Sequence, residues 1–142
     1  MNIQNILLPF DGSVHSDHAL DHAVAMAKLT NASITLLTCY DLLPTLDDMA
    51  MPHIDEVRRQ YGVSANKILV AGREKLEAAG VPFKSVLQEG RAGKIIAEMA
   101  GSGRFDMVIM GSGGHSSIAG LLIGSVTHKV LGSIHCPVLI VP

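Results

Sequence analysis

Short, almost uninterrupted hydrophobic runs alternate along this chain with segments in which hydrophobic positions recur every three or four residues. The runs cover residues 3–8, 33–39, 83–88, 107–110 and 137–141, and each of them predicts a strand. Continuous rather than alternating hydrophobicity is typical of strands that are covered on both faces. The pattern therefore predicts a parallel sheet with helices on its two sides.

Helical periodicity predicts helices over the segments between these runs, at residues 14–29, 54–79, 92–100 and 125–131. In the first of them, the apolar residues spaced to form one face are Val14, Leu20, Val24 and Ala27. Gly80 follows the second helix and predicts its end. Residues 41–52 contain two prolines and predict a loop whose conformation the pattern does not define.

Strands and helices thus alternate through the whole chain without a repeat, a linker or a shift in composition. This order predicts an α/β fold with one domain over residues 1–142, a doubly wound, Rossmann-like sheet of five parallel strands. Right-handed crossovers favour the strand order 3-2-1-4-5. Ligands of such sheets bind at the carboxyl ends of the strands where the order reverses, here between the first and fourth strands.

Composition narrows the classes of protein to which the chain can belong. Of its 142 residues 48% are hydrophobic and 17% are charged, with a formal net charge of -2, which excludes low-complexity disorder and disfavours nucleic-acid binding. No apolar run reaches membrane-spanning length and the N-terminus lacks a signal-peptide pattern, so we expect a cytoplasmic protein without membrane contact. Cys39 and Cys136 form no CxxC pair, and we interpret both as inert core thiols.

Two loops are predicted to meet at the reversal point, residues 9–13 and residues 111–117. The second loop is rich in glycine, which lets backbone N–H groups approach an anion closely. Gly124 and Ser125 then open a helix whose N-terminus favours phosphate, with hydroxyl donors from Ser125 and Thr127. No Lys or Arg occurs between Gly111 and His128, so the backbone would hold the phosphates.

Each of these features also has a plainer interpretation. The glycine-rich loop can be a flexible connection with Gly124 as the helix cap. Asp11 can form the turn before the first helix together with Ser13, or it can accept from ribose hydroxyls or help to hold Mg²⁺. The spacing of Gly111, Gly114, Gly124 and Ser125, which fits G-x2-G-x9-G-[S/T], favours the phosphate site.

With this spacing, the opening strand into residues 9–13, the second strand and the closing residues 136–141, the chain resembles the universal stress protein family, in its ATP-binding branch. The resemblance implies an adenine nucleotide alpha hydrolase-like fold and a bound adenine nucleotide, ATP or else ADP or AMP, together with Mg²⁺. It implies phosphate contacts for Gly111, Gly114, Gly124, Ser125 and Val126, and a nucleoside site near Pro9, Asp11 and Cys39. Met110, His115 and Thr127 complete the predicted set.

Other signatures fit less well. Residues 90–95 resemble the end of a Walker loop, but they lack its first glycine and its hydroxyl, and we interpret them as a strand exit. Residues 112–117 resemble the pyrophosphate loop of adenylating enzymes but have Ser116 in place of its Asp, and no GxGxxG follows the first strand. His18 and His22 could in principle bind Zn²⁺, but without a further ligand in the sequence pattern we favour a solvated helix face shared with His15.

The function that the sequence favours is nucleotide-dependent signalling or stress response through an unidentified protein partner. The resemblance also implies a homodimer built with the C-terminal strand, whose apolar edge needs a cover. The alternative is an enzyme, a slow ATPase or an autophosphorylating protein that uses Ser116 or Ser117. No catalytic base or arginine finger is evident, so we expect any hydrolysis to be slow. An interaction protein that uses the fold without a nucleotide is the third possibility.

Overall fold

A single sheet carries all five strands of the computed structural model, which describes residues 2–42, 54–113, 123–133 and 135–142. The elements are, in chain order, β1 (Asn5–Pro9), α1 (Val14–Thr30), β2 (Ser33–Tyr40), α3 (Ile54–Ala79), β3 (Phe83–Glu89), α4 (Ala92–Ala100), β4 (Met107–Gly111), α5 (Ser125–Leu131) and β5 (Val138–Val141). Every strand pair is parallel and the order is β3-β2-β1-β4-β5. The predicted fold class and the strand order 3-2-1-4-5 are confirmed.

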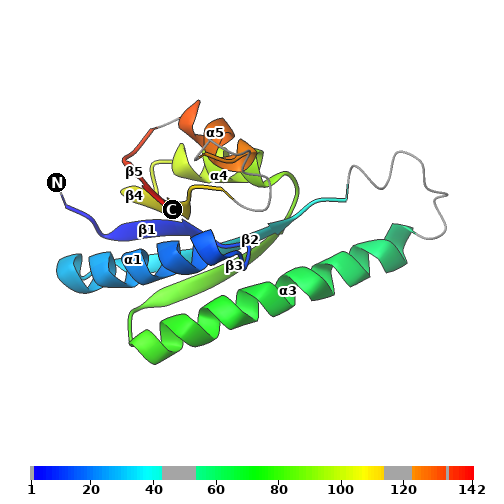
Figure 1. Ribbon diagram of the computed structural model, residues 1–142, viewed down its shortest axis with the longest axis horizontal. Helices are drawn as coiled ribbons and strands as arrows, with labels where there is room; N and C mark the ends of the chain where they lie inside the picture. The colour runs from blue at the N-terminus through cyan, green and yellow to red at the C-terminus, as the bar shows by residue number, and fades with distance from the viewer. Residues whose placement is uncertain (1, 43–53, 114–122, 134) are drawn as a thin grey trace.

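Helices cover both faces of this sheet, with α1 and α3 on one side and α4 and α5 on the other (Figure 1). Successive strand residues point to opposite faces, so Leu7 belongs to the core under α4 and α5, and Leu8 to the core under α1 and α3. Both side chains are fully buried. Cores on both faces explain why the strands are hydrophobic without alternation.

The strand ends differ by one or two residues from the prediction, for reasons visible in the hydrogen bonds. β1 begins at Asn5 rather than at residue 3, because the backbone N–H groups of Gln4 and Asn5 donate to Asp106 Oδ2, both at 2.9 Å. β5 begins at Val138, since Pro137 has no N–H to donate and only its carbonyl pairs with Val108, at 2.9 Å.

The buried face of α1 also differs from the prediction. Val14 is 66% exposed, and the residues that the helix buries are mostly small: Ser16, Ala19, Leu20, Ala23 and Ala27. Small side chains allow a helix to approach a sheet closely. At Gly111, for example, an added Cβ would lie 2.8 Å from the Cβ of His15.

Helix ends follow the predicted signals. Ser13 is the N-cap of α1, and Gly80, with φ of 73°, ends α3 by donating to the Leu76 and Glu77 carbonyls. Most of the predicted loop 41–52 lies outside the described residues. In the described part of the chain, none of the helices combines the length and the apolar character needed to cross a membrane.

Candidate functional site

A cavity of about 290 Å³ opens at the carboxyl ends of β1, β2 and β4, where the strand order reverses. Its lining combines the β1–α1 junction (residues 9–16), the β4–α5 junction and one side of α4. The residues are Pro9, Phe10, Asp11, Ser13, Ser16, Leu37, Cys39, Ala92, Ile96, Met110, Gly111, Gly113, Gly124, Ser125, Val126 and Thr127. This is the position that the fold predicts for a ligand.

At the β1–α1 junction, side chains satisfy the start of the helix. The Ser13 Oγ accepts from the Ser16 N–H at 3.2 Å, and the Ser16 hydroxyl donates to the Ser13 carbonyl at 2.9 Å. Asp11 Oδ1 accepts from the Ser13 N–H at 2.9 Å, while Gly12 adopts a positive φ of 79°. The turn-forming role of Asp11 is therefore confirmed, and the residue also lines the cavity.

The β4–α5 junction is built differently, because the N-cap of α5 is Gly124, which offers no side-chain acceptor. The N–H groups of the first turn of a helix have no partner within the helix. In α5 the first of these N–H groups belong to Ser125 and Val126, and both residues line the cavity. Together with the positive end of the helix dipole, this arrangement favours an anion.

Backbone hydrogen bonds hold the two ends of that junction together. The Gly124 N–H donates to the Ser112 carbonyl at 2.6 Å, and the Ser112 N–H donates to the Val141 carbonyl at 2.7 Å. The Thr127 hydroxyl donates to the Gly111 carbonyl at 2.9 Å. The interpretation of Thr127 as a phosphate donor is thus corrected: its proton is used to fix the end of β4, and its oxygen can only accept further bonds.

Gly111 also has a contact role that the sequence did not indicate. A Cβ at this position would lie 2.8 Å from the Cβ and 2.9 Å from the carbonyl carbon of His15. No real Cβ tolerates such distances, so the end of β4 approaches the first turn of α1 as closely as it does because position 111 has no side chain.

Nine of the eleven predicted site residues line this one cavity: Pro9, Asp11, Cys39, Met110, Gly111, Gly124, Ser125, Val126 and Thr127. Gly114 and His115 lie outside the described residues, as do Ser116 and Ser117 of the alternative interpretation. Sequence reasoning missed the walls formed by Phe10, Ser13, Ser16, Leu37, Ala92 and Ile96. Ala92 and Ile96 lie one turn apart on α4, a spacing that could have indicated a shared face.

Burial sets the chemistry of the two thiols. It raises the pKa of Cys39, in the cavity wall, to about 11. The pKa of Cys136 is raised as well, first by burial and then by the nearby Asp106 carboxylate. Both cysteines are free, and both remain protonated at neutral pH, which fits their interpretation as inert thiols.

Among the described lining residues, Asp11 is the one ionisable acid besides the thiol, and none is Lys, Arg or His. Basic side chains of the described residues therefore do not neutralise an anion in this cavity. Backbone N–H groups at the start of α5 are the donors that the site offers, with hydroxyls from Ser13 and Ser125 in the same lining.

This chain is similar in sequence to known proteins over almost its whole length. The family model "Universal stress protein family" matches residues 2–142. A curated relative, the universal stress protein YxiE of Bacillus subtilis, is 32% identical, with 96% of this chain and 97% of the relative covered.

Solved structures agree with the sequence comparison. The structure of the hypothetical protein MJ0577 of Methanocaldococcus jannaschii superposes with a TM-score of 0.86 at 26% identity, covering 99% of this chain and 96% of that one. A universal stress protein in complex with cAMP gives a TM-score of 0.72 at 26% identity, covering 99% and 98%. Because the family model spans nearly the whole sequence, the chain belongs to the universal stress protein family.

Proposed function

We propose that the cavity binds an adenine nucleotide, ATP with Mg²⁺ foremost and ADP or AMP as alternatives. The observation that carries this proposal is the meeting of an uncapped helix start, a glycine-lined strand end and a carboxylate in one cavity at the sheet's reversal point. The cAMP complex of a relative supports the ligand class. ATP itself is what the resemblance to the ATP-binding branch of the family implies, a resemblance that rests in part on the glycine spacing.

The lining suggests how such a ligand lies. Phosphates belong beside Gly113 and the N–H groups of Ser125 and Val126, because these are the anion donors of the cavity. Leu37, Cys39 and Ile96 form an apolar wall suited to the flat face of a base. In this binding mode the ribose connects the phosphates to the base. Asp11 would accept hydrogen bonds from the ribose hydroxyls or hold a metal ion.

Mg²⁺ fits the chemistry of the donors, since Asp11 supplies a carboxylate and Ser125 a hydroxyl, and Mg²⁺ prefers oxygen ligands shared with substrate phosphates. Its positive charge would offset both Asp11 and the phosphates, in a lining whose described residues include no Lys or Arg. Asp11 would hold the ion, and the ion would neutralise phosphate charge.

The same lining supports binding rather than turnover. Fast phosphoryl transfer needs a positioned base or water and a cation on the transferred group. The described lining offers Asp11, already an acceptor in its turn, and no arginine. We therefore propose a cytoplasmic signalling module in which nucleotide occupancy changes partner binding. Incubation with γ-labelled ATP should release no phosphate above the buffer rate and leave no label on the protein.

Titration with a fluorescent ATP analogue and Mg²⁺ tests the binding site. Gly124→Val, which places a branched side chain at the helix start, should lower affinity at least about tenfold, a loss of about 1.4 kcal/mol. Gly132→Val at the other end of α5 is the matched control, because a Cβ there meets its nearest atom at an ordinary 3.5 Å. Absence of binding at millimolar nucleotide, or equal binding by both variants, would refute the site.

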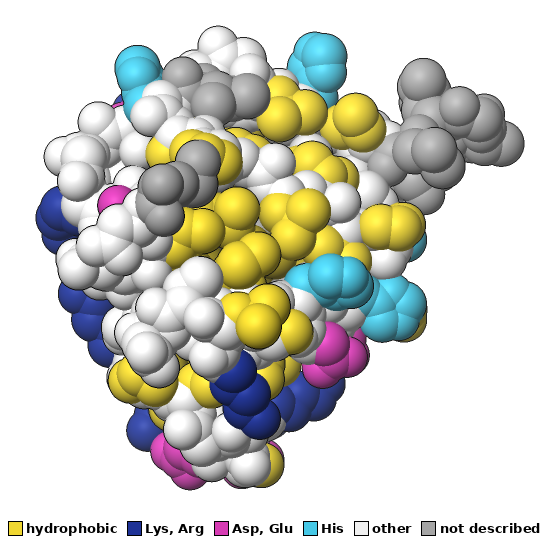
Figure 2. All heavy atoms as spheres, turned by 90° about the vertical axis from the view of Figure 1, so that its left-hand side faces the viewer, with side chains coloured by type: hydrophobic (Ala, Val, Ile, Leu, Met, Phe, Trp, Pro, Cys, Tyr) yellow, Lys and Arg dark blue, Asp and Glu magenta, His cyan; other side chains and the backbone are white. Residues whose placement is uncertain are grey.

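We further propose a homodimer through β5. Among the described residues this strand pairs only with β4, and its residues Val138, Leu139 and Ile140 are half-buried. Figure 2 looks onto the side of the molecule that carries β5 and shows hydrophobic side chains gathered at its centre. An open apolar edge of this kind favours pairing with a second copy. Light scattering should give twice the chain mass at micromolar concentration, and a monomer would contradict the proposal.

A further inference from the structure

Two histidines lie outside the cavity, on the exposed side of α1. His18 and His22 are four positions apart in the sequence, so their side chains project from the same face of the helix, one turn apart. Both are exposed to solvent. Figure 2 shows histidine side chains beside the hydrophobic centre of the face that carries β5. The sequence alone left this pair as a solvated surface.

The hydrogen bonds of the two rings assign their protons. His18 Nδ1 lies 2.9 Å from the backbone oxygen of Pro142, and His22 Nδ1 lies 2.9 Å from the carbonyl oxygen of His18. Backbone oxygens only accept hydrogen bonds, so in each neutral ring the proton belongs on Nδ1. The Nε2 atom of each ring is then the nitrogen with the free lone pair.

This is the state in which histidines bind metal ions, with one ring nitrogen donating to a backbone carbonyl and the other free to coordinate. We infer that His18 and His22 form a binding site for a borderline divalent transition-metal ion. Imidazole pairs suit Cu²⁺, Ni²⁺ and Zn²⁺, with Cu²⁺ the strongest, whereas Mg²⁺ prefers oxygen ligands. The site is distinct from the nucleotide cavity, whose lining contains neither residue.

The described residues contain no group of three or more His, Cys, Asp or Glu side chains placed to share a metal ion. Water therefore completes the coordination, as in an exchangeable surface site rather than a closed structural zinc centre. His15, one turn before His18, does not join them. Its buried Nδ1 has no hydrogen-bond partner among the described residues, and its Cβ faces Gly111 at the end of β4.

A bound ion would also strengthen the fold where α1 meets β5. The His18 ring already joins the helix to Pro142, directly after the last strand. Coordination would fix this ring in the tautomer and orientation that the hydrogen bond needs. Because the ion binds the folded helix better than the unfolded chain, metal should raise the unfolding temperature.

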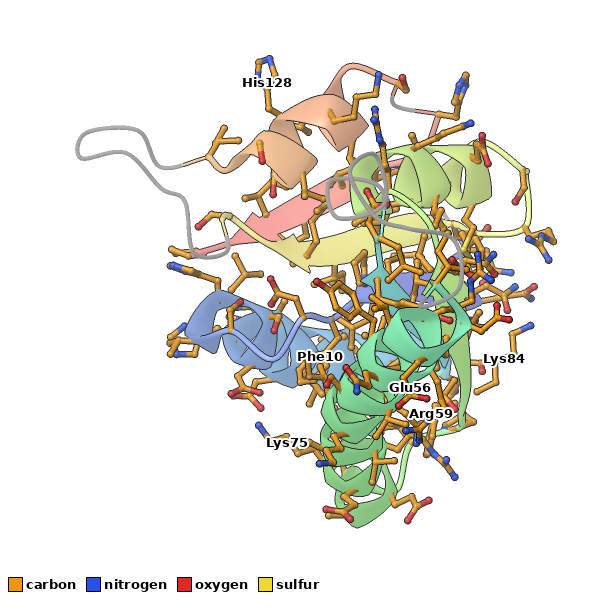
Figure 3. All side chains as sticks on the ribbon, turned by 90° about the vertical axis from the view of Figure 1, so that its right-hand side faces the viewer. Phe10, Glu56, Arg59, Lys75, Lys84 and His128 are labelled. Carbon is orange, nitrogen blue, oxygen red and sulfur yellow. The ribbon has the colours of Figure 1, made fainter. Side chains whose placement is uncertain are left out.

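Calorimetric titration of the untagged, nucleotide-free protein with Cu²⁺, Ni²⁺ and Zn²⁺ tests the inference. We expect one ion per chain, with Cu²⁺ tightest, and no response to Mg²⁺. His18→Gln and His22→Gln should each lower the affinity at least about tenfold, because each leaves a single imidazole in place of a chelating pair. His128→Gln is the matched control, since His128 projects outward from α5 (Figure 3) and is exposed.

Thermal unfolding supplies a readout that does not depend on heats of binding. Ni²⁺ should raise the midpoint of the parent and of His128→Gln, and leave the His18→Gln/His22→Gln double variant unchanged. Metal-free midpoints of all variants show whether each still folds. Equal affinity in the parent and the double variant, or an equal loss in His128→Gln, would overturn the site. Because no nucleotide is present, either outcome leaves the proposed nucleotide function to its own test.

Discussion

The two strand-to-helix junctions that border the cavity solve the same problem in opposite ways. At the β1–α1 junction, Asp11 and Ser13 accept the N–H groups of the turn and of the first helical residues. At the β4–α5 junction the cap is Gly124, which has no side chain to offer. One helix start is thus completed by its own sequence, and the other is left with donors that face the cavity.

This difference separates a structural turn from a ligand-binding one. Glycine as an N-cap costs only a few tenths of a kcal/mol relative to serine or aspartate, so leaving α5 uncapped is a small loss of stability. In return, the cap residue places no side-chain oxygen over the first N–H groups of α5. The comparison predicts that adding a cap at one junction changes binding, and that removing a cap at the other changes stability.

Gly124→Asp should give the largest effect, because it supplies α5 with a capping carboxylate at the place proposed for phosphate. The added charge repels the ligand, and its oxygens take the N–H donors. We expect ATP affinity to fall about 100-fold, which is about 2.7 kcal/mol, while the free energy of unfolding changes by less than about 1 kcal/mol. Equilibrium titration and chemical denaturation measure the two quantities.

Ser133→Asp is the control for charge alone, since position 133 is exposed beyond the opposite end of α5. It should bind ATP as the parent does. If Gly124→Asp binds as well as Ser133→Asp, the uncapped start of α5 has no role in binding, and the contrast between the junctions is only structural.

Gly111→Ala should have the next largest effect, this time on stability. The new Cβ would meet the Cβ of His15 at 2.8 Å and its carbonyl carbon at 2.9 Å, so α1 and β4 must move apart. Overpacking of this kind costs about 1–3 kcal/mol. Gly132→Ala, with its nearest contact at 3.5 Å, should be neutral or slightly stabilising in the same urea titration. Equal midpoints for the two variants would contradict the close contact.

The fold and the positions of the two junctions could be predicted from the sequence. Uninterrupted hydrophobic strands predicted the parallel sheet, and the sheet predicted where the two junctions meet. Gly111, Gly124 and Ser125 were identified by their spacing, and Asp11 by its position after the first strand. The fold is confirmed and these four residues do line the cavity, because the period of hydrophobic residues and the chemistry of turns are local properties that the chain order carries directly; their contacts with a nucleotide stay a prediction.

Other features depend on contacts that sequence order does not encode. The predicted burial of Val14 is wrong, because α1 approaches the sheet through small residues such as Ala19 and Ala23. The bond from Thr127 to the Gly111 carbonyl joins residues 16 apart, and the wall formed by Ile96 comes from a different helix. The tautomers of His18 and His22 depend on backbone acceptors that only the folded chain positions.

Ser13→Ala should have a moderate effect, confined to the capped junction. It removes the acceptor for the Ser16 N–H, a bond of 3.2 Å, and N-cap removal costs about 1 kcal/mol. Denaturant unfolding should show this loss. Ser133→Ala, which removes an exposed serine hydroxyl just beyond the C-terminal end of α5, provides the control. A Ser13→Ala variant as stable as this control would show that Asp11 alone suffices to hold the turn.

The smallest expected effect concerns Cys39, where we predict slow alkylation of the thiol and no loss of binding or stability. Burial raises its pKa to about 11 from an ordinary value of 9.0, so the folded state favours the protonated thiol. The thiol's contribution to stability is therefore complete below about pH 9 and declines as the pH rises towards 11. At pH 8 only about 0.1% of such a thiol is ionised, against about 10% for an ordinary one.

In a Cys136→Ala background, iodoacetamide should label Cys39 about 100-fold more slowly in buffer than in urea at pH 8, and the rate should rise about tenfold per pH unit up to pH 10. Equal rates in buffer and urea would show that the wall of the cavity leaves this thiol exposed, and a bound nucleotide could not then be expected to cover it.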